Sequence, residues 1–308
     1  MQQTVLISGA SGLIGTALSG HLRKAGFAIH KLARDNPDAQ FNYSSESKRV
    51  TLDDSIPLHA VVNLAGPSIA DGRWTDSRKR ELLDSRVDVT TALASALATA
   101  TRPPNVFLSA SAVGFYGESD EPLDEDSPAG SDFLAAVATS WEQATAPARR
   151  AGIPTAHLRF GVVLSTKGGV LGKLMLPFSL CAGGRLGDGK QPMSWIALPD
   201  VLIILTRLIE DPALLTAHTD PKGACTLNLV AGEPITNADF TKALGRAIRR
   251  PTPFPLPKSL IRLLFGEMGD ALLLGHSSVV SKRLSNLGIA LQYPNIDLAL
   301  AHLIENKT

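Results

Sequence analysis

A short apolar run that ends in three regularly spaced glycines constrains this chain more than any other feature. The run Val5–Ser8 predicts a buried strand, and Gly9, Gly12 and Gly15 follow it before a helical pattern begins. The first glycine permits a tight turn, the second lets a pyrophosphate approach the backbone, and the third lets the helix pack on the sheet, with its unpaired N–H groups facing negative charge. Scattered glycines are common and a bare match to the pattern can be chance, but a strand before them, a helix after them and a place near the N-terminus favour a dinucleotide site. We expect the intervening residues to touch the dinucleotide as well: Ser11, Leu13 and Ile14.

The overall composition is that of an ordinary chain large enough to bury a core. It has 308 residues, of which 44% are hydrophobic and 19% charged, and its net charge is +1. A charge this close to neutral gives no electrostatic basis for binding nucleic acid or an acidic membrane surface, so we expect a small-molecule partner. The length suits one large domain or two and predicts no particular oligomeric state.

The cysteines and the apolar runs indicate in which cellular compartment the protein is located. Cys181 and Cys225 are too few and too far apart for a disulfide framework or a metal knuckle, so we predict inert thiols, a reducing compartment and no metal. No apolar run approaches the roughly 18 residues that span a bilayer. The first strand begins near Thr4, which leaves no room for a leader peptide. These features predict a cytoplasmic protein.

Apolar runs typical of strands alternate with helical patterns over the first half of the chain. The helical patterns cover Leu13–Lys24 and Val87–Ala100. The strand-like runs are Val5–Ser8, Ala28–Leu32, Ala60–Leu64, Val106–Ser109 and Thr155–Arg159. Such alternation predicts an α/β fold with a doubly wound parallel sheet of the Rossmann-like type, in which helical crossovers cover both faces.

The end of the second strand bears on which dinucleotide fits the glycine loop. Folds that bind NAD place a carboxylate about 20 residues beyond the glycines, where it holds the ribose hydroxyls. If Ala33 stands at that position, no carboxylate repels a 2′-phosphate, and Arg34 beside it can grip the phosphate with two hydrogen bonds. This pattern predicts NADP as the cofactor. Two alternatives stay open: Asp35 in a shifted register would favour NAD, and Arg34 can be an ordinary surface charge.

A change of pattern after Arg159 predicts a second, smaller lobe. Glycine-rich loops and helices follow, and the cluster Pro251–Pro257 cannot lie inside a helix or a central strand. That cluster is typical of an extended connector before the final helices, which we expect to begin near Lys258. We therefore divide the chain into residues 1–165, an NADP-binding domain, and residues 166–308, a substrate lobe with C-terminal helices, some of whose strands can return to the main sheet.

Three short motifs at the ends of later strands, added to the glycine loop, carry a family resemblance. Asn63–Gly66 ends one predicted strand, Ser109–Ser111 ends the next, and Phe115–Gly117 lies in the loop that follows. With these motifs the chain resembles the extended short-chain dehydrogenase/reductases that act on nucleotide sugars.

The resemblance narrows to an atypical, epimerase-like subgroup often labelled nucleoside-diphosphate-sugar epimerase. The matching segments in the first two thirds of the chain are Trp74, Ser85–Arg86, Val113–Gly117, Asp124–Pro128, Trp141–Glu142, Arg159–Leu164, Leu176–Phe178 and Ser194–Ile196. The subgroup also has a C-terminal segment of unassigned function, matched here by Pro255–Pro257, Ser278–Val280, Lys282–Leu284 and Tyr293–Pro294. The resemblance thus covers nearly the whole chain.

One catalytic element of the wider family is missing. In that family a tyrosine and a lysine four residues later share a helix face, because a phenol with a pKa of about 10 needs a nearby cation to act near neutral pH. The residues four positions after the three tyrosines here are Ser47, Asp120 and Asp297, and the helix positions where the pair should lie hold Leu134 and Ala138. The subgroup is similar in this respect, which puts ordinary short-chain dehydrogenase chemistry in question.

The resemblance leaves two catalytic candidates near the expected nicotinamide site. Ser111 matches the serine that hydrogen-bonds the reacting oxygen, and Tyr116 matches the tyrosine of the following loop. Ser111 can orient a substrate hydroxyl or carbonyl, and Tyr116 can exchange a proton if a cation lies close. The alternative is that Ser109 and Ser111 only cap a strand end and that Tyr116 only packs on the second lobe.

Further cofactor contacts are expected at the carboxyl ends of the strands, where open parallel sheets bind their ligands. There the turn Leu64, Ala65 and Gly66 should lie along the cofactor together with Ser109, although the turn can also be a plain strand-to-loop connection. The resemblance adds Arg86, on the helical stretch after Trp74. Taken alone, Arg86 is typical of a solvated helix charge.

The second lobe is predicted to supply the substrate contacts. Pro177, Arg185 and Trp195 are the main candidates, with Arg185 as a cation for an anionic group and Trp195 as an aromatic wall. The lobe also contains Phe178, Gly183, Gly184, Gln191 and Ser194. Alternatively, Trp195 belongs to the core and Arg185 is a surface charge. The subgroup has a histidine after the Trp-Ile pair, whereas this chain has Ala197.

These observations imply an NADP-dependent oxidoreductase or epimerase-like enzyme acting on an unidentified small molecule, with nucleotide sugars as one candidate class. Hydride transfer is the step that the resemblance implies. The competing interpretation is a non-catalytic NADP-binding regulator or scaffold, which the missing tyrosine–lysine pair favours.

Overall fold

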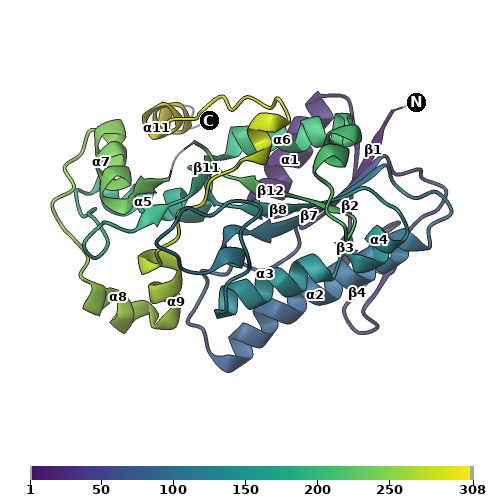
Figure 1. The fold of residues 1–308 in the computed structure, drawn as a ribbon, viewed down its shortest axis with the longest axis horizontal. Helices are drawn as coiled ribbons and strands as arrows, with labels where there is room; N and C mark the ends of the chain where they lie inside the picture. The colour runs from purple at the N-terminus through teal and green to yellow at the C-terminus, as the bar shows by residue number, and fades with distance from the viewer. Residues whose placement is uncertain (1, 233, 306–308) are drawn as a thin grey trace.

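A six-stranded parallel sheet forms the centre of the molecule in the computed structural model, which describes residues 2–232 and 234–305 (Figure 1). Its strands lie in the order β12-β8-β7-β6-β1-β2, and every neighbouring pair is parallel. Their bounds are β1 Thr4–Ser8, β2 Ala28–Lys31, β6 Ala60–Asn63, β7 Val106–Ala112, β8 Thr155–Phe160 and β12 Ala224–Leu229. This arrangement confirms the doubly wound, Rossmann-like fold.

Helices cover both faces of this sheet because alternate side chains of each strand point to opposite faces. On one face α1 (Leu13–Lys24) and α6 (Leu198–Glu210) pack on apolar side chains from all the central strands. On the other face lie α2 (Asp76–Ala98) and α4 (Ala146–Arg150), with α3 (Phe133–Gln143) beside α2. The layers can be followed in Figure 1.

The elements predicted from the first half of the sequence are confirmed with small shifts at their ends. The helix Leu13–Lys24 is found with both of its predicted bounds. The pattern Val87–Ala100 is the second half of α2, whose charged first half begins after Thr75, where the threonine hydroxyl accepts a hydrogen bond from the Arg78 N–H. Strand β12 was not among the strand-like runs named from the sequence, and it is a strand from beyond residue 165 that joins the main sheet. The division of the chain at that residue stays a prediction.

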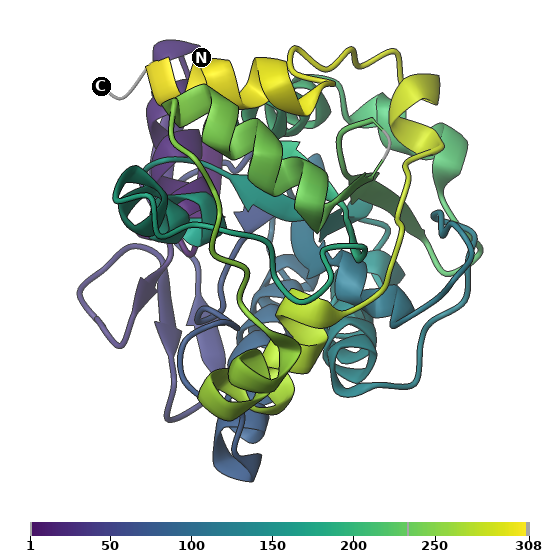
Figure 2. The same ribbon diagram turned by 90° about the vertical axis from the view of Figure 1, so that its left-hand side faces the viewer.

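A second hydrophobic core lies beside the first and gathers elements from the later part of the chain. It packs around Trp195 and Phe240. Its elements are β9 Val162–Leu164, α5 Gly169–Ser179, β10 Pro192–Met193, β11 Trp195–Ala197, β13 Ile235–Thr236, α7 Asn237–Ile248 and α11 Ile296–Glu305. Figure 2 shows α7 and α11 side by side, in agreement with their packing.

The remaining elements are short. The proline connector leads into α8 (Lys258–Phe265), which begins at the predicted residue. The others are β3 Ala33–Arg34, β4 Asn42–Ser44, β5 Arg49–Thr51, η1 Val113–Tyr116, η2 Pro212–His218, α9 Glu267–Gly269, η3 Asp270–Leu274 and α10 Arg283–Asn286. Among the described residues, no helix combines the length and hydrophobicity needed to cross a bilayer.

Candidate functional site

The glycine loop between β1 and α1 has the geometry of an anion cradle. Gly9 has φ +66°, and a Cβ there would lie 2.4 Å from the Leu64 carbonyl oxygen. A Cβ on Gly15 would lie 2.3 Å from the Gly9 carbonyl oxygen, so both positions require glycine. At Gly12, apart from its two chain neighbours, the one atom of the described residues within 4 Å of such a Cβ is the Gly9 oxygen, at 3.3 Å. The protein therefore leaves space beside Gly12, which a Cβ would enter.

The amino end of α1 is free to receive negative charge. Gly12 is the residue that precedes the helix, no side chain caps the first turn, and that turn contains no acidic residue. Its N–H groups are therefore left for a ligand. A hollow of about 690 Å³ runs along α1 as far as Lys24 and against Leu198 and Leu202 of α6, and it reaches the glycine loop at its Ser11–Leu13 end. These features fit a dinucleotide's pyrophosphate.

Just beyond β2, in β3, Arg34 is exposed beside Asp35, whose carboxylate is also bound by Ser45. Asp35 has φ +53°, and its carboxylate accepts hydrogen bonds from the Ser45 backbone N–H (2.7 Å) and hydroxyl (2.8 Å). The Ser45 hydrogen bonds lower the pKa of Asp35. The Arg34 side chain is 72% exposed, and its Nε lies 3.6 Å from the Asp35 carboxylate. Arg34 is thus the accessible group, which suits the NADP prediction.

The Arg86 side chain packs against the turn that follows β6, at Gly66 and Pro67. Its guanidinium donates to the carbonyl oxygens of Leu82 (2.9 Å) and Pro67 (2.8 Å), and it lies over the Trp141 ring at 5.1 Å. A Cβ on Gly66, which has φ +153°, would lie 3.1 Å from the Arg86 guanidinium carbon. Arg86 is only 7% exposed, and burial lowers its pKa to about 10. The structure therefore places the guanidinium between the turn, its own helix and Trp141, and a contact with the cofactor stays a prediction.

Polar side chains form two rows across the carboxyl half of the sheet. The inner polar row pairs Asn63 with Ser109, Ser109 with His157, and His157 with Thr226. The outer polar row, one step nearer the strand ends, pairs Ser111 with Arg159 and Arg159 with Asn228. The rows lie two residues apart on each strand, so they share the face that α3 covers.

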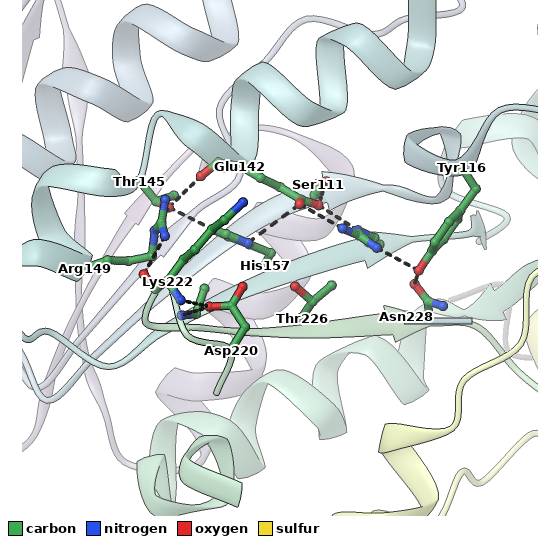
Figure 3. Close-up of polar contacts among 12 residues, drawn as sticks. Ser111, Tyr116, Glu142, Thr145, Arg149, His157, Asp220, Lys222, Thr226 and Asn228 are labelled. Atoms are coloured by element: carbon green, nitrogen blue, oxygen red, sulfur yellow. Dashed lines mark hydrogen bonds and ion pairs between the residues drawn. The ribbon is translucent and has the colours of Figure 1, made fainter. Parts of the chain in front are cut away.

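The outer polar row is tied together by Glu142 of α3 (Figure 3). The Ser111 hydroxyl donates to Glu142 Oε1 at 2.8 Å. Arg159 donates to the same carboxylate twice, from Nε to Oε1 at 2.7 Å and from Nη2 to Oε2 at 2.9 Å. Arg159 Nη1 also donates to the Tyr116 hydroxyl at 2.8 Å, and that hydroxyl donates to Asn228 Oδ1 at 2.7 Å. Both catalytic candidates therefore belong to one buried network.

The charge states in this network depend on two opposing effects: burial disfavours the charged form of each group, and hydrogen bonds and nearby charges favour it. Burial raises the pKa of Glu142, but hydrogen bonds from Arg159 and Ser111 and the positive charge beside it outweigh burial and hold this pKa below its usual value. Burial lowers the pKa of Arg159, and the Glu142 carboxylate more than restores it. Burial raises the pKa of Tyr116 to about 12, although Arg159 opposes the rise. The pair is ionised and the phenol is neutral near pH 7.

His157 extends the network away from Tyr116. Its Nε2 lies 2.8 Å from the Thr145 hydroxyl, and its Nδ1 lies 3.8 Å from Glu142 Oε2. Burial lowers the pKa of His157 to about 4, so the imidazole is neutral at physiological pH. The cation beside Tyr116 is accordingly Arg159 of β8, and it does not bring the pKa of the phenol below its usual value.

The roles of Glu142, Arg159 and Asn228 were not predicted from the sequence. Two of them lie in segments that carry the family resemblance, but no spacing rule connects them to Tyr116. A local signal did exist, since polar residues alternate with apolar ones in two otherwise buried strands, β8 and β12. Buried polar side chains at alternate strand positions indicate a polar face that needs partners.

The predicted substrate residues lie in three different settings. Trp195 is 1% exposed and packs within the second core, while its indole N–H has no hydrogen-bond partner among the described residues. Arg185 is exposed in the loop after α5. Pro177 is half-buried inside α5. Their contact with a substrate stays a prediction.

Comparison with known proteins identifies the family. A family model described as the NAD dependent epimerase/dehydratase family matches residues 5–219, and a domain of unknown function (DUF1731) matches residues 256–303. Epimerase family protein Mb2239 of Mycobacterium bovis is 39% identical over 301 residues, which cover 97% of this chain and 96% of that protein.

Two solved structures extend the likeness to the whole fold. Human epimerase family protein SDR39U1, solved with NADPH, is 32% identical with a TM-score of 0.89, over 99% of this chain and 100% of that chain. The nucleoside-diphosphate sugar epimerase of Corynebacterium glutamicum is 33% identical with a TM-score of 0.64, over 99% of this chain and 66% of that one. These matches confirm the resemblance drawn from the sequence, and the chain belongs to the NAD dependent epimerase/dehydratase family.

Proposed function

We propose that this protein binds NADP at the glycine loop and acts as an oxidoreductase or epimerase-like enzyme on a small molecule. The observation that carries the proposal is the open space at Gly12, at the uncapped amino end of α1. The exposed Arg34 supports NADP over NAD because its guanidinium can pair with a 2′-phosphate. The human relative that was solved with NADPH supports the same choice.

The proposed catalytic site is the Ser111–Tyr116 end of the buried network. Bound NADP would supply the hydride chemistry. The chain's own part would be to orient a substrate oxygen with the Ser111 hydroxyl and to offer a proton from Tyr116. A phenol with a pKa near 12 holds its proton at neutral pH, so Tyr116 suits the role of acid better than that of base. Arg159, which reaches Tyr116 from β8, would be the cation of this site in place of the missing lysine on the helix.

A second candidate function is a non-catalytic NADP-binding regulator or scaffold. The observation that favours it is that both hydroxyl protons are already donated within the protein, from Ser111 to Glu142 and from Tyr116 to Asn228. A substrate oxygen would have to compete with those acceptors. For both candidates we propose a cytoplasmic location, supported by two unpaired thiols, Cys181 and Cys225.

Turnover separates the two candidates. The purified protein would first be titrated with NADPH and NADH, then loaded with NADPH and mixed with a panel of carbonyl compounds and nucleotide sugars while absorbance at the nicotinamide band is followed. Oxidation by one compound class, abolished in Tyr116→Phe and Ser111→Ala, supports the enzyme. Tight NADPH binding with no oxidation by any compound supports the regulator.

A further inference from the structure

The C-terminal segment reaches back to the network through an extended stretch, residues 276–282. This stretch lies beside the loop after η1. The Ser119 N–H donates to the His276 carbonyl oxygen at 2.8 Å, the Leu123 N–H to the Ser278 oxygen at 2.8 Å, and the Val280 N–H to the Leu123 oxygen at 2.9 Å. In Figure 2 the stretch is part of a single pass from α9 to α10. It belongs to the region that matches a domain of unknown function.

One buried carboxylate fastens this stretch to the sheet. Glu125 is 7% exposed, and its Oε1 accepts from the Ser281 hydroxyl at 2.6 Å and from the Asn228 backbone N–H at 3.1 Å. Its Oε2 accepts from the Lys282 N–H at 2.9 Å. Glu125 therefore joins the C-terminal stretch to β12 at Asn228.

The side-chain amide of Asn228 is oriented by the same stretch. Asn228 is 0% exposed, and its Nδ2 donates to the Val280 carbonyl oxygen at 2.9 Å. A carbonyl oxygen can only accept, so the amide nitrogen must face Val280 and Oδ1 must face Tyr116. The opposite orientation would place two oxygens together at Val280 and leave Tyr116 facing a donor.

This orientation decides where the Tyr116 proton points. The hydroxyl has one proton, and Oδ1 of Asn228 can only accept it, while Arg159 Nη1 can only donate to the phenol oxygen. The phenol is therefore held between a donor from β8 and an acceptor from β12, as Figure 3 shows for Tyr116 and Asn228. Reversing the amide would remove that acceptor.

We propose that Asn228 is a positioning residue, through which residues 276–282 of the C-terminal segment hold the Tyr116 hydroxyl in line with Arg159. This gives part of the segment a role in the site instead of a purely structural one. The proposal rests on the proposed function only for the role of Tyr116 as a proton donor; the orientation of its hydroxyl does not depend on that function. The alternative is that the stretch merely covers the sheet and that Tyr116 keeps its geometry without it.

The test reads the Tyr116 hydrogen bond directly by vibrational spectroscopy. The Raman ring doublet of tyrosine differs between a phenol that both donates and accepts and one that only accepts. The chain has three tyrosines, so subtracting the spectrum of Tyr116→Phe isolates one signal. Asn228→Leu should convert that signal from the donor-and-acceptor form to the acceptor-only form. Thr226→Val is the matched control, because Thr226 lies on the same face of β12 and is also buried.

A second variant tests the part played by the C-terminal stretch while leaving Asn228 in place. Ser281→Ala removes one hydrogen bond to a buried carboxylate, so amide exchange over residues 276–282 should be faster by about tenfold or more. The Tyr116 Raman signal should shift in the same variant. An unchanged signal in Asn228→Leu overturns the proposal, and an unchanged signal in Ser281→Ala with faster exchange overturns the part assigned to the segment.

None of these readings needs a cofactor or a substrate. If NADPH fails to bind, the proposed function fails while the Raman result stands. If Asn228→Leu does not fold, Ser281→Ala carries the test alone, with the same two outcomes.

Discussion

Arg159 and Glu142 form a two-pronged ion pair between β8 and α3, with nitrogen–oxygen distances of 2.7 and 2.9 Å. Both side chains are at most 10% exposed. The same carboxylate accepts the Ser111 hydroxyl, and the same guanidinium donates to Tyr116. The charge and geometry of the two catalytic candidates thus depend on this pair.

Removing one partner of the pair should destabilise the protein strongly. In Glu142→Gln the Arg159 guanidinium stays buried without its carboxylate, which costs about 3 to 5 kcal/mol of unfolding free energy. Urea denaturation measures it. The double variant Glu142→Gln with Arg159→Met removes both charges. Its unfolding free energy should therefore fall by less than the sum of the decreases in the two single variants. Losses that simply add would contradict this account. Asp71→Asn, at an exposed pair with Lys173, is the control and should change little.

Acid should destabilise the protein through His157. The unfolded chain binds a proton at this residue near pH 6.5, whereas in the folded chain burial lowers its pKa to about 4. Between these values the unfolded state binds more protons, so stability is complete above pH 6.5 and falls as the pH drops toward 4. The slope is at most about 1.4 kcal/mol per pH unit. The unfolding free energy should depend less steeply on pH across this window in His157→Gln than in the wild type. An equal slope in both proteins would exclude His157 as the cause.

Arg34 should set the choice of cofactor. In Arg34→Ala the affinity for NADP should fall by about tenfold to a hundredfold, the range for a lost charge-assisted hydrogen bond, while the affinity for NAD stays nearly unchanged. Fluorescence titration of both nucleotides gives the ratio. Lys31→Ala, three residues earlier and also exposed, should leave the ratio as in the wild type. Equal losses for NADP and NAD in Arg34→Ala would remove the proposed role.

Substitution by alanine should change the unfolding free energy in opposite directions at Gly9, in the loop before α1, and at Gly20, within α1. Gly9→Ala requires a left-handed backbone and a Cβ 2.4 Å from a carbonyl oxygen, so the unfolding free energy should fall by more than about 1 kcal/mol. Gly20 lies in α1, where an added Cβ would have no neighbour within 4 Å, so Gly20→Ala should stabilise the protein by up to about 1 kcal/mol. Thermal unfolding of the two variants checks both signs. Similar effects would mean that the loop does not require glycine at Gly9.

The sequence predicted the fold well wherever a strong local pattern coincided with burial. Strand β1 and helix α1 are examples, since an apolar run, a glycine turn and a helical period agree over consecutive residues. Strand β12 was missed because its alternation of Thr226 and Asn228 with apolar neighbours is only six residues long and lies beyond the glycine-rich loops, where no strand–helix alternation marks it. Its pairing with β8 joins segments that are far apart in the chain, so no local sequence pattern predicts it.

The candidate site could be predicted only in part for the same reason. Ser111 and Tyr116 stand out by their place after a strand, and the structure puts both in one network. Their partners come from α3, β8 and β12, up to 112 residues away in the chain. The cation beside Tyr116 was sought four residues along a helix, whereas Arg159 reaches it from a neighbouring strand.

Calorimetric titration of NADPH into the wild type and Gly12→Ala tests the central claim most directly, which is that the glycine loop binds the cofactor's pyrophosphate. A Cβ at Gly12 enters the open space and meets only the Gly9 oxygen, at 3.3 Å, so the variant should fold. The account predicts one NADPH bound per wild-type chain and far weaker binding by the folded variant. A wild-type protein that binds neither NADPH nor NADH, or a variant that binds NADPH equally well, would contradict it.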